Sequence, residues 1–190
     1  MDEAQLRAEY VMPFYMMSAT EEVERSVEIA AAASTAAIDD VLALIGHAGW
    51  REQKVGALFS IVRAEPEIVD AVLHALESSR GWFTFPYLCA SAMLNSGEHA
   101  ISSLQEFQRQ THASSRPEVA CSEVATAALE VLGATSEFEA STDKSRETLD
   151  TILANARALR GAARRGRTVT CPRANPAGVE NSGLPTVRRH

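Results

Sequence analysis

The stretch from Gly46 to Val62 constrains the fold more than any other part of the chain. A short Gly-His-Ala-Gly turn leads into a Trp-Arg pair, and apolar residues then recur at the three- and four-residue spacing of one helix face: Val55, Leu58, Phe59 and Val62. Glu52, Gln53 and Ser60 fall largely on the other side of that helix. The spacing therefore predicts an amphipathic helix, opened by Trp50, that buries one face against the rest of the chain.

A similar pattern returns about every 35 residues, with a small residue placed before a large apolar one in the segments 87–94 and 127–133. Self-similarity at such a period is typical of helical hairpins that cannot bury their apolar faces alone and therefore stack on one another. Gly56 and Ala57 lack bulky side chains, so we expect a neighbouring helix to approach closely there. We also expect Trp50 to be buried between two hairpins.

The segments between these units carry apolar sets of the same helical spacing: Ile38, Val41, Leu42 and Ile45, then Val69, Val72, Leu73 and Leu76. A third set is looser, because polar Gln105 and Gln108 stand among the apolar residues Ile101, Leu104 and Phe107. The chain is therefore expected to alternate outer helices, such as the one opened by Trp50, with inner helices. An irregular helical bundle with coincidental spacing is the alternative.

The unit W-R-x-x-x-V-G-A-L at residues 50–58 and the opening Y-V-x-P-F-Y at residues 10–15 carry a resemblance. They resemble the HEAT-like repeats of the phycobilisome-lyase type and, more narrowly, an uncharacterised bacterial family with both features. The resemblance covers about residues 8 to 133, although only one unit has the Trp-Arg pair. It implies an all-α fold, a right-handed stack of antiparallel helical hairpins forming a HEAT-like α-solenoid of about four pairs. It implies no activity, because a fold does not determine a function.

The charge pattern divides the chain into two parts, a helical domain over residues 1–160 and a basic disordered tail over residues 161–190. The tail holds six of the 18 Lys and Arg residues and, in Glu180, one of the 25 Asp and Glu residues, which leaves the body with 12 basic and 24 acidic residues. The tail lacks apolar periodicity. We therefore expect deletion of everything after Gly161 to leave stability nearly unchanged.

Several local signals place helix boundaries. Ser18 and Glu21 have the spacing of a capping box, and Pro66 suits the first turn of a helix over 66–78. A second capping box is expected at residues 115–118, and a long charged helical stretch over about 136–160, either continuous or broken near Ser141-Thr142. Residues 80–86 are expected to form a loop that folds its aromatic rings under the next helix.

The sequence offers no foothold for catalysis or metal binding. Its histidines include no H-x-H, H-x-x-x-H or H-E-x-x-H arrangement, and no P-loop, G-x-S-x-G or G-x-G-x-x-G is present. We therefore expect no cofactor, no metal site and no catalytic residues.

Arg51 is expected to hold an acidic partner in a neighbouring hairpin. No signal peptide or membrane span is expected, and the three separated cysteines, Cys89, Cys121 and Cys171, indicate reduced thiols in a cytoplasmic protein.

One polar stripe is a candidate binding site. Asp70, His74 and Glu77 lie opposite the apolar face of the 66–78 helix, and inner helices of repeat proteins line a concave binding surface. The next helix is expected to contribute Ser102, Gln105 and Arg109. An ordinary solvated face is the alternative interpretation of the same residues.

Two functions follow from these patterns. The leading hypothesis is a non-enzymatic module whose acidic concave face binds a basic protein partner, for example an immunity protein that neutralises a basic toxin. The alternative is a nucleic-acid-associated HEAT-like protein that uses the arginine-rich tail, or a HEAT-like enzyme such as a DNA glycosylase. The acidic body argues against the alternative, because it repels phosphate and attracts basic partners.

Overall fold

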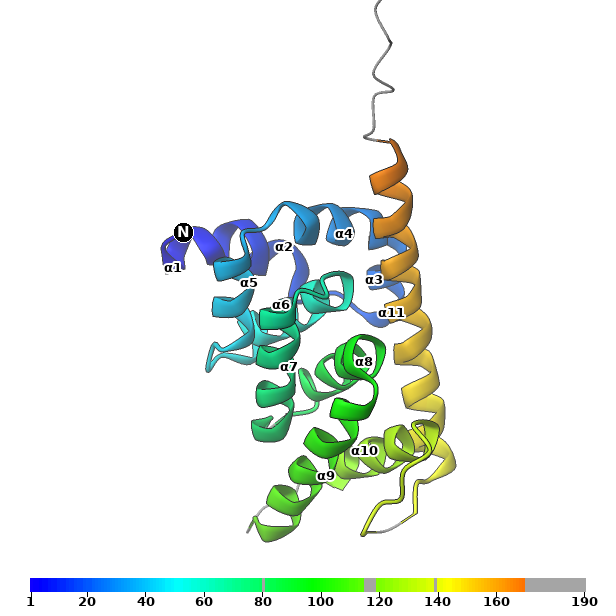
Figure 1. The fold of residues 1–190 in the computed structure, drawn as a ribbon. Helices are drawn as coiled ribbons and strands as arrows, with labels where there is room; N and C mark the ends of the chain where they lie inside the picture. The colour runs from blue at the N-terminus through cyan, green and yellow to red at the C-terminus, as the bar shows by residue number, and fades with distance from the viewer. Residues whose placement is uncertain (80, 115–118, 139, 170–190) are drawn as a thin grey trace, which may run out of the picture.

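The computed structural model describes residues 1–79, 81–114, 119–138 and 140–169, and this part of the chain contains helices and no strand (Figure 1). The helices are α1 Glu3–Leu6, η1 Arg7–Val11 (a π-helix), α2 Met12–Phe14, α3 Ala19–Glu24, α4 Ser26–Thr35, α5 Ile38–Ile45, α6 Trp50–Val62, α7 Pro66–Ser78, α8 Phe85–Ser96, α9 Glu98–Ala113, α10 Val119–Val131 and α11 Asp143–Val169. The prediction of an all-α fold is confirmed.

Three layers of helices make up the body. Consecutive helices pack in pairs, α5 with α6, α7 with α8 and α9 with α10, so that α5, α7 and α9 form one layer and α6, α8 and α10 the next. The long helix α11 then crosses the second layer and also packs along α4 (Figure 1). The helices α6, α8 and α10 are therefore the middle layer of the body.

Helix α6 is buried on nearly all sides, which corrects the prediction that it is an amphipathic outer helix. Nine of its thirteen residues are buried, and they include Glu52, Lys54 and Ser60 as well as the apolar residues. The reason is that α5 covers one side of α6, while α4, α8 and α11 cover the others. A pattern of apolar spacing does not reveal a second covering layer that comes from a distant part of the chain.

Helix α6 crosses α5 most closely at Gly56, as the sequence predicts. A Cβ atom added to Gly56 would lie 2.6 Å from the backbone nitrogen of Ile45 and 2.8 Å from the carbonyl carbon of Leu44. Real Cβ atoms do not approach backbone atoms so closely, and backbone cannot rotate away as a side chain can. Any side chain at residue 56 therefore pushes the two helices apart.

We expect Gly56→Ala to destabilise the protein by about 1–3 kcal/mol, because the strain of overpacking exceeds the gain in helix propensity. The matched control is Gly166→Ala on α11, where an added Cβ meets no atom within 4 Å. That control should stabilise by about 0.5–1 kcal/mol, as alanine does at an open helical position. Urea unfolding followed by circular dichroism measures both, and equal effects of the two substitutions would contradict the close crossing.

Other local predictions have mixed outcomes. The capping box at Ser18 is present, because its hydroxyl accepts from the backbone of Glu21 and the Glu21 carboxylate accepts from the backbone of Ser18. Helix α7 spans the predicted Pro66–Ser78. Of the helical stretch predicted over 136–160, the part after the expected break near Ser141-Thr142 is helical, since α11 begins at Asp143, and the box predicted at residues 115–118 lies outside the described residues.

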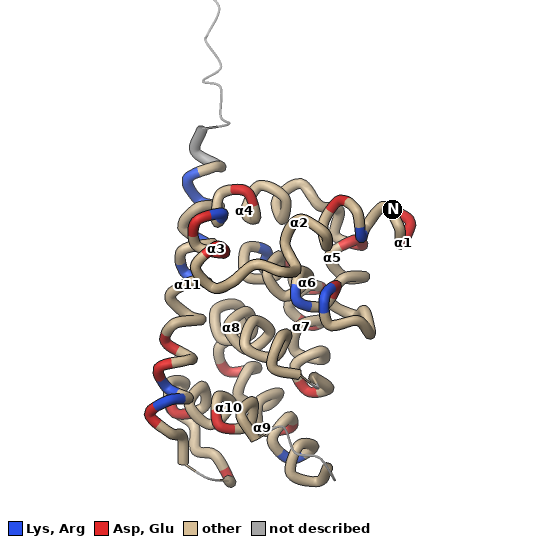
Figure 2. The backbone as a smooth tube through the Cα atoms, turned by 180° about the vertical axis from the view of Figure 1, so that it is seen from behind, with Lys and Arg blue, Asp and Glu red and all other residues tan. Residues whose placement is uncertain are grey.

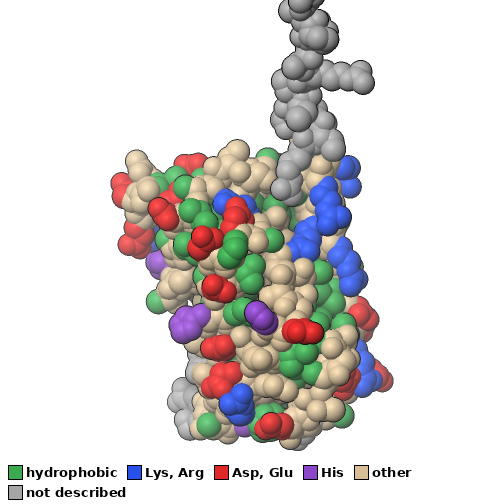
Figure 3. Space-filling view, in the orientation of Figure 1, with side chains coloured by type: hydrophobic (Ala, Val, Ile, Leu, Met, Phe, Trp, Pro, Cys, Tyr) green, Lys and Arg blue, Asp and Glu red, His purple; other side chains and the backbone are tan. Residues whose placement is uncertain are grey.

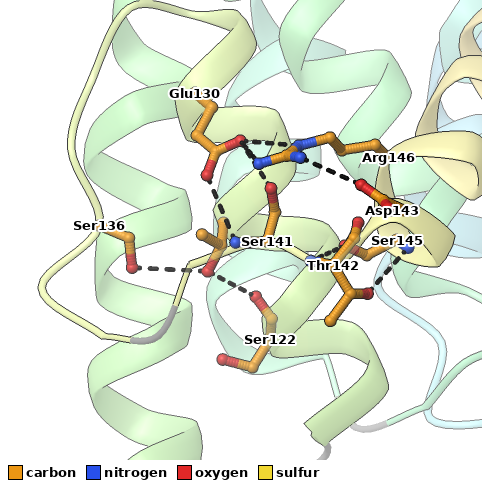
Figure 4. Close-up of polar contacts among 9 residues, drawn as sticks. Ser122, Glu130, Ser136, Ser141, Thr142, Asp143, Ser145 and Arg146 are labelled. Carbon is orange, nitrogen blue, oxygen red and sulfur yellow. Dashed lines mark hydrogen bonds and ion pairs between the residues drawn. The ribbon is translucent and has the colours of Figure 1, made fainter.

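A polar network fixes the start of α11 against α10 (Figure 4). The Glu130 carboxylate accepts from the Ser141 hydroxyl at 2.6 Å and from the Arg146 guanidinium at 3.2 Å. These contacts, led by the hydrogen bond from Ser141, lower the pKa of Glu130 from its ordinary value. The hydroxyls of Thr142 and Ser145 complete the turn by pairing with each other's backbone. The network therefore fixes the direction in which α11 begins, so that the helix runs back across the middle layer.

Gly161, where the tail is expected to begin, falls inside α11, which continues to Val169. Ala162 and Ala163 are buried in a small cluster with Ala30 of α4, and Val62 packs against this cluster. Small residues allow α11 and α4 to come close along this line. Residues 170–190, which make up the rest of the expected tail, lie outside the described part of the chain.

We now expect truncation after Gly161 to destabilise the body, in contrast to the expectation from composition. A chain ending at residue 161 loses the burial of two alanine side chains and uncovers α4, which together cost about 1–2 kcal/mol. A chain ending at residue 169 keeps these contacts and is the matched control. Thermal unfolding of the two truncated chains compares them, and identical midpoints would show that the last turns of α11 contribute no packing energy.

Candidate functional site

The structure brings together the three residues predicted on α7. Asp70, His74 and Glu77 line a surface hollow of about 330 Å³, and α9 contributes His99, Ser102 and Ser103 to the same hollow. Glu77 accepts a hydrogen bond of 2.8 Å from the buried Ser103 hydroxyl, so its carboxylate is held in place. Asp70 and His74 are exposed. We call this hollow the α7/α9 groove.

The other two predicted residues do not line the α7/α9 groove. Gln105 is half-buried, and Arg109 is exposed and pairs with Glu106 on its own helix at 2.7 Å. The sequence analysis grouped both residues with Ser102, as the contribution of the next helix to the α7 stripe, and of these three only Ser102 lines the groove. The groove therefore contains Ser102 from the predicted rung, together with His99 and Ser103, which the sequence analysis did not single out.

A second hollow, of about 420 Å³, lies where α6, the start of α8 and α11 meet. We call it the aromatic pocket, and its lining residues are Met17, Ala19, Lys54, Trp82, Phe83, Pro86, Tyr87, Glu147, Thr148, Thr151 and Ile152. Its volume is within the range of roughly 300–1,000 Å³ that is usual for small-molecule sites. The sequence analysis did not predict this pocket.

A buried ion pair stands beside the aromatic pocket. Lys54 of α6 lies 2.9 Å from Glu22 of α3, and both side chains are almost fully buried. The Tyr87 hydroxyl donates to the same Glu22 oxygen at 2.8 Å, and Lys54 also donates to the Met17 carbonyl at 2.9 Å. Burial and the neighbouring Glu22 carboxylate raise the pKa of Tyr87, so the phenol stays protonated and remains a donor.

A row of contacting rings lies near the pocket, and we call it the aromatic ladder: Tyr15, Trp50 and Phe83. The sequence predicted instead that the rings of the loop before α8 fold under that helix. Phe85 is fully buried, but Trp82 is 42% exposed and Phe83 is 60% exposed. Phe83 lies against Trp50, with ring centroids 4.9 Å apart, and the half-buried Trp50 also contacts Tyr15. The expectation of a buried Trp50 is therefore only partly met.

The interpretation of Arg51 also changes. Its guanidinium lies over the Trp50 ring, 4.7 Å from the centroid, and 5.4 Å from the centroid of Tyr15. A cation over an aromatic face is attracted by the ring quadrupole. Arg51 therefore extends the aromatic ladder, and no ion pair of Arg51 is found within the described part of the chain.

Sequence spacing could not reveal the buried pair. Glu22 sits within the first helical turns after a capping box, where an acidic residue is usual. Lys54 lies in the charged opening of α6, and Tyr87 is 65 residues from Glu22. The one available signal is a lysine close before the small and apolar run from Val55 to Ile61, and that signal names no partner.

The described residues contain no group of three or more His, Cys, Asp or Glu side chains placed to hold a metal ion. In the same part of the chain, no helix combines the length and the apolar character that a membrane span requires. Cys89 and Cys121 are buried and form no disulfide, and burial raises the pKa of Cys89 to about 12. Cys89 is therefore protonated and a poor nucleophile at neutral pH.

Comparisons with protein-family models, with curated proteins and with solved structures returned no match to this chain. The resemblance to HEAT-like repeats therefore stays a prediction from the sequence.

We expect Lys54→Met to destabilise the protein by about 3–5 kcal/mol, because it leaves the Glu22 carboxylate buried without its counter-charge. The double substitution Lys54→Met with Glu22→Leu should recover much of that loss, since it removes both charges. Denaturant unfolding of wild type, both single variants and the double variant completes the cycle. A Lys54→Met protein as stable as wild type would show that the ion pair does not contribute to the free energy of unfolding.

Proposed function

We propose that this chain is a non-enzymatic protein-binding module that binds a basic partner through the α7/α9 groove. The observation that carries the proposal is the charge of the layer to which the groove belongs. Helices α5, α7 and α9 contain seven carboxylates, two in α5, three in α7 and two in α9, against one basic residue apart from histidine, Arg109. Acidic and histidine side chains gather over α7 and α9 in the space-filling view (Figure 3).

The arrangement of charge supports a protein partner over a nucleic acid at this face. A layer of one charge sign raises the local concentration of oppositely charged partners and speeds their association. Phosphate is repelled by the same field. The hydrogen bond from Ser103 holds Glu77 in a fixed position, so part of the acidic surface is organised before any partner arrives.

The arrangement of the helix pairs as a repeat stack is part of the same proposal. We infer that the pairs α5/α6, α7/α8 and α9/α10 are HEAT-like hairpins of a short right-handed solenoid, supported by their consecutive packing and by the W-R-x-x-x-V-G-A-L unit. A cytoplasmic immunity protein that neutralises a basic toxin is one concrete form of the function. Cys89 and Cys121 form no disulfide, which supports a reducing compartment.

The nucleic-acid alternative has one specific observation in its favour. The last turns of α11 carry the exposed arginines Arg157, Arg164 and Arg165, and basic positions concentrate there in Figure 2 and Figure 3. Arginine is well suited to contact phosphate. Binding of a DNA or RNA duplex that is lost on substituting these arginines, and unaffected by changes in α7, would favour this alternative.

The test of the proposed function compares two charge reversals of equal size on different faces. Asp70→Lys changes the α7/α9 groove, and Asp150→Lys is the matched control on α11. We expect Asp70→Lys to weaken capture of a basic partner from host lysate by about tenfold or more, and Asp150→Lys to leave it near wild type. Glu77→Gln, which keeps an acceptor for Ser103, should weaken it less.

Salt supplies a second readout of the same interaction. Capture should fall as ionic strength rises, because the Debye length shrinks to about 10 Å at 0.1 M salt and screens the acidic layer. Circular dichroism of each variant serves as the folding control. Partners that bind Asp70→Lys and Asp150→Lys equally well, or that bind more tightly at high salt, would place the interaction elsewhere on the molecule.

A further inference from the structure

The aromatic pocket has hydrogen-bond donors that are already engaged. Lys54 donates to Glu22 and to the Met17 carbonyl, and Tyr87 donates to Glu22. The hydroxyls of Thr148 and Thr151 donate to carbonyls of their own helix at 2.8 and 2.9 Å. The side chains that line the pocket therefore have few donors left for a ligand.

Acceptors, in contrast, remain available. Each threonine hydroxyl that donates to the helix backbone keeps its lone pairs for another donor. Glu147 lines the pocket and is exposed. Glu22 is 1% exposed, and its Oε2 atom has no hydrogen-bond partner among the described residues. Glu22 does not line the pocket, so Glu147 and the two threonine hydroxyls are the acceptors that a ligand in the pocket can reach.

The charge of the pocket agrees with this count of acceptors. Lys54 lies 2.9 Å from Glu22, so the positive charge of one compensates the negative charge of the other. Glu147 then leaves the lining with an uncompensated negative charge. Trp82 and Phe83 add exposed aromatic faces at the mouth, and aromatic faces attract cations. Hydrogen bonding, charge and aromatic surface thus select the same kind of ligand.

We propose that the aromatic pocket binds an organic cation, an alkylammonium or alkylguanidinium group attached to an apolar body. The cation donates to Glu147 and to the threonine hydroxyls and lies near the faces of Trp82 and Phe83, and the apolar body packs against the apolar part of the lining, which includes Ile152. The volume of about 420 Å³ accommodates such a group. This site is formed by elements other than α7 and α9, so it does not depend on the function proposed for the α7/α9 groove.

The test uses phenethylamine as the probe and 2-phenylethanol as its neutral counterpart, with the full chain in both titrations. Isothermal titration calorimetry measures affinity, and tryptophan fluorescence reports on the mouth of the pocket because Trp82 is one of two tryptophans. We expect the amine to bind, and the alcohol to bind at least about tenfold more weakly, because it offers no charge-assisted hydrogen bond.

Two substitutions and one control locate the binding. Glu147→Gln and Trp82→Ala each remove one recognition element from exposed positions, and each should weaken binding of phenethylamine about tenfold. Asp150→Asn removes a carboxylate from the same helix outside the pocket lining and should leave binding unchanged. Circular dichroism confirms folding of each variant.

The possible outcomes are distinct. Equal binding of amine and alcohol, no binding of amine up to about 10 mM, or equal losses in Glu147→Gln and Asp150→Asn would overturn the proposal. A blocked Gly-Arg-Gly peptide then distinguishes the source of the cation. Tighter binding of the peptide than of phenethylamine assigns the site to an arginine side chain of a partner, whereas weaker binding assigns it to a free amine, and both results support a cation site.

Discussion

The body is organised by the need to pair the buried polar groups of α6, a helix that is covered on nearly all sides. Each buried polar group of α6 finds its partner in a different element. Lys54 pairs with Glu22 of α3, and the Ser60 hydroxyl donates to Ser91 of α8 at 2.8 Å. The carbonyl of Ile61, at the end of α6, accepts from Arg160 of α11 at 2.8 Å. Because an unpaired buried polar group costs about 1–3 kcal/mol, these elements must assemble around α6 together.

Arg160 has a special place in this arrangement. Its guanidinium also donates to the Leu94 carbonyl in the last turn of α8 at 3.1 Å and to the side chain of Asn95. Asn95 in turn donates to the Ser60 carbonyl at 2.9 Å. One arginine therefore satisfies terminal carbonyls of two helices, where the negative end of each helix dipole favours a cation. The middle layer is held in register by a residue from the third layer.

Helix boundaries and caps could be predicted from the sequence, but the burial of one helix by distant parts of the chain could not. Helix α7 from Pro66 to Ser78 and the capping box at Ser18 depend on neighbouring residues, so spacing and residue type were sufficient. The spacing leaves Ser60 off the apolar face of its helix, yet it is fully buried. Its hydroxyl and its carbonyl are hydrogen-bonded to Ser91 and Asn95 of α8, and α11 covers the end of α6 from about 100 positions further along the chain. Periodicity within one segment does not show which distant helix will cover it.

The candidate sites also differ in whether local spacing was enough to predict them. Asp70, His74 and Glu77 lie one helical turn apart, so a periodic pattern could group them, and the structure places them in one groove. Gln105 and Arg109 depended on the register between two helices, which periodicity does not determine. The aromatic pocket combines α6, α8 and α11 with the segment before α3, and no local pattern could have assembled it.

The path of α11 has a consequence for how the chain acquires its structure. Stacked hairpins make mostly local contacts and can form one after another as the chain leaves the ribosome. Here Asn155 of α11 donates to the Ala19 carbonyl across 136 residues, and Arg160 reaches Ile61 across 99. Contacts between residues so distant in the chain slow folding, because the intervening loop must close first. We therefore expect α6 to stay incompletely covered until α11 has been synthesised, and the helices around it to complete their packing together.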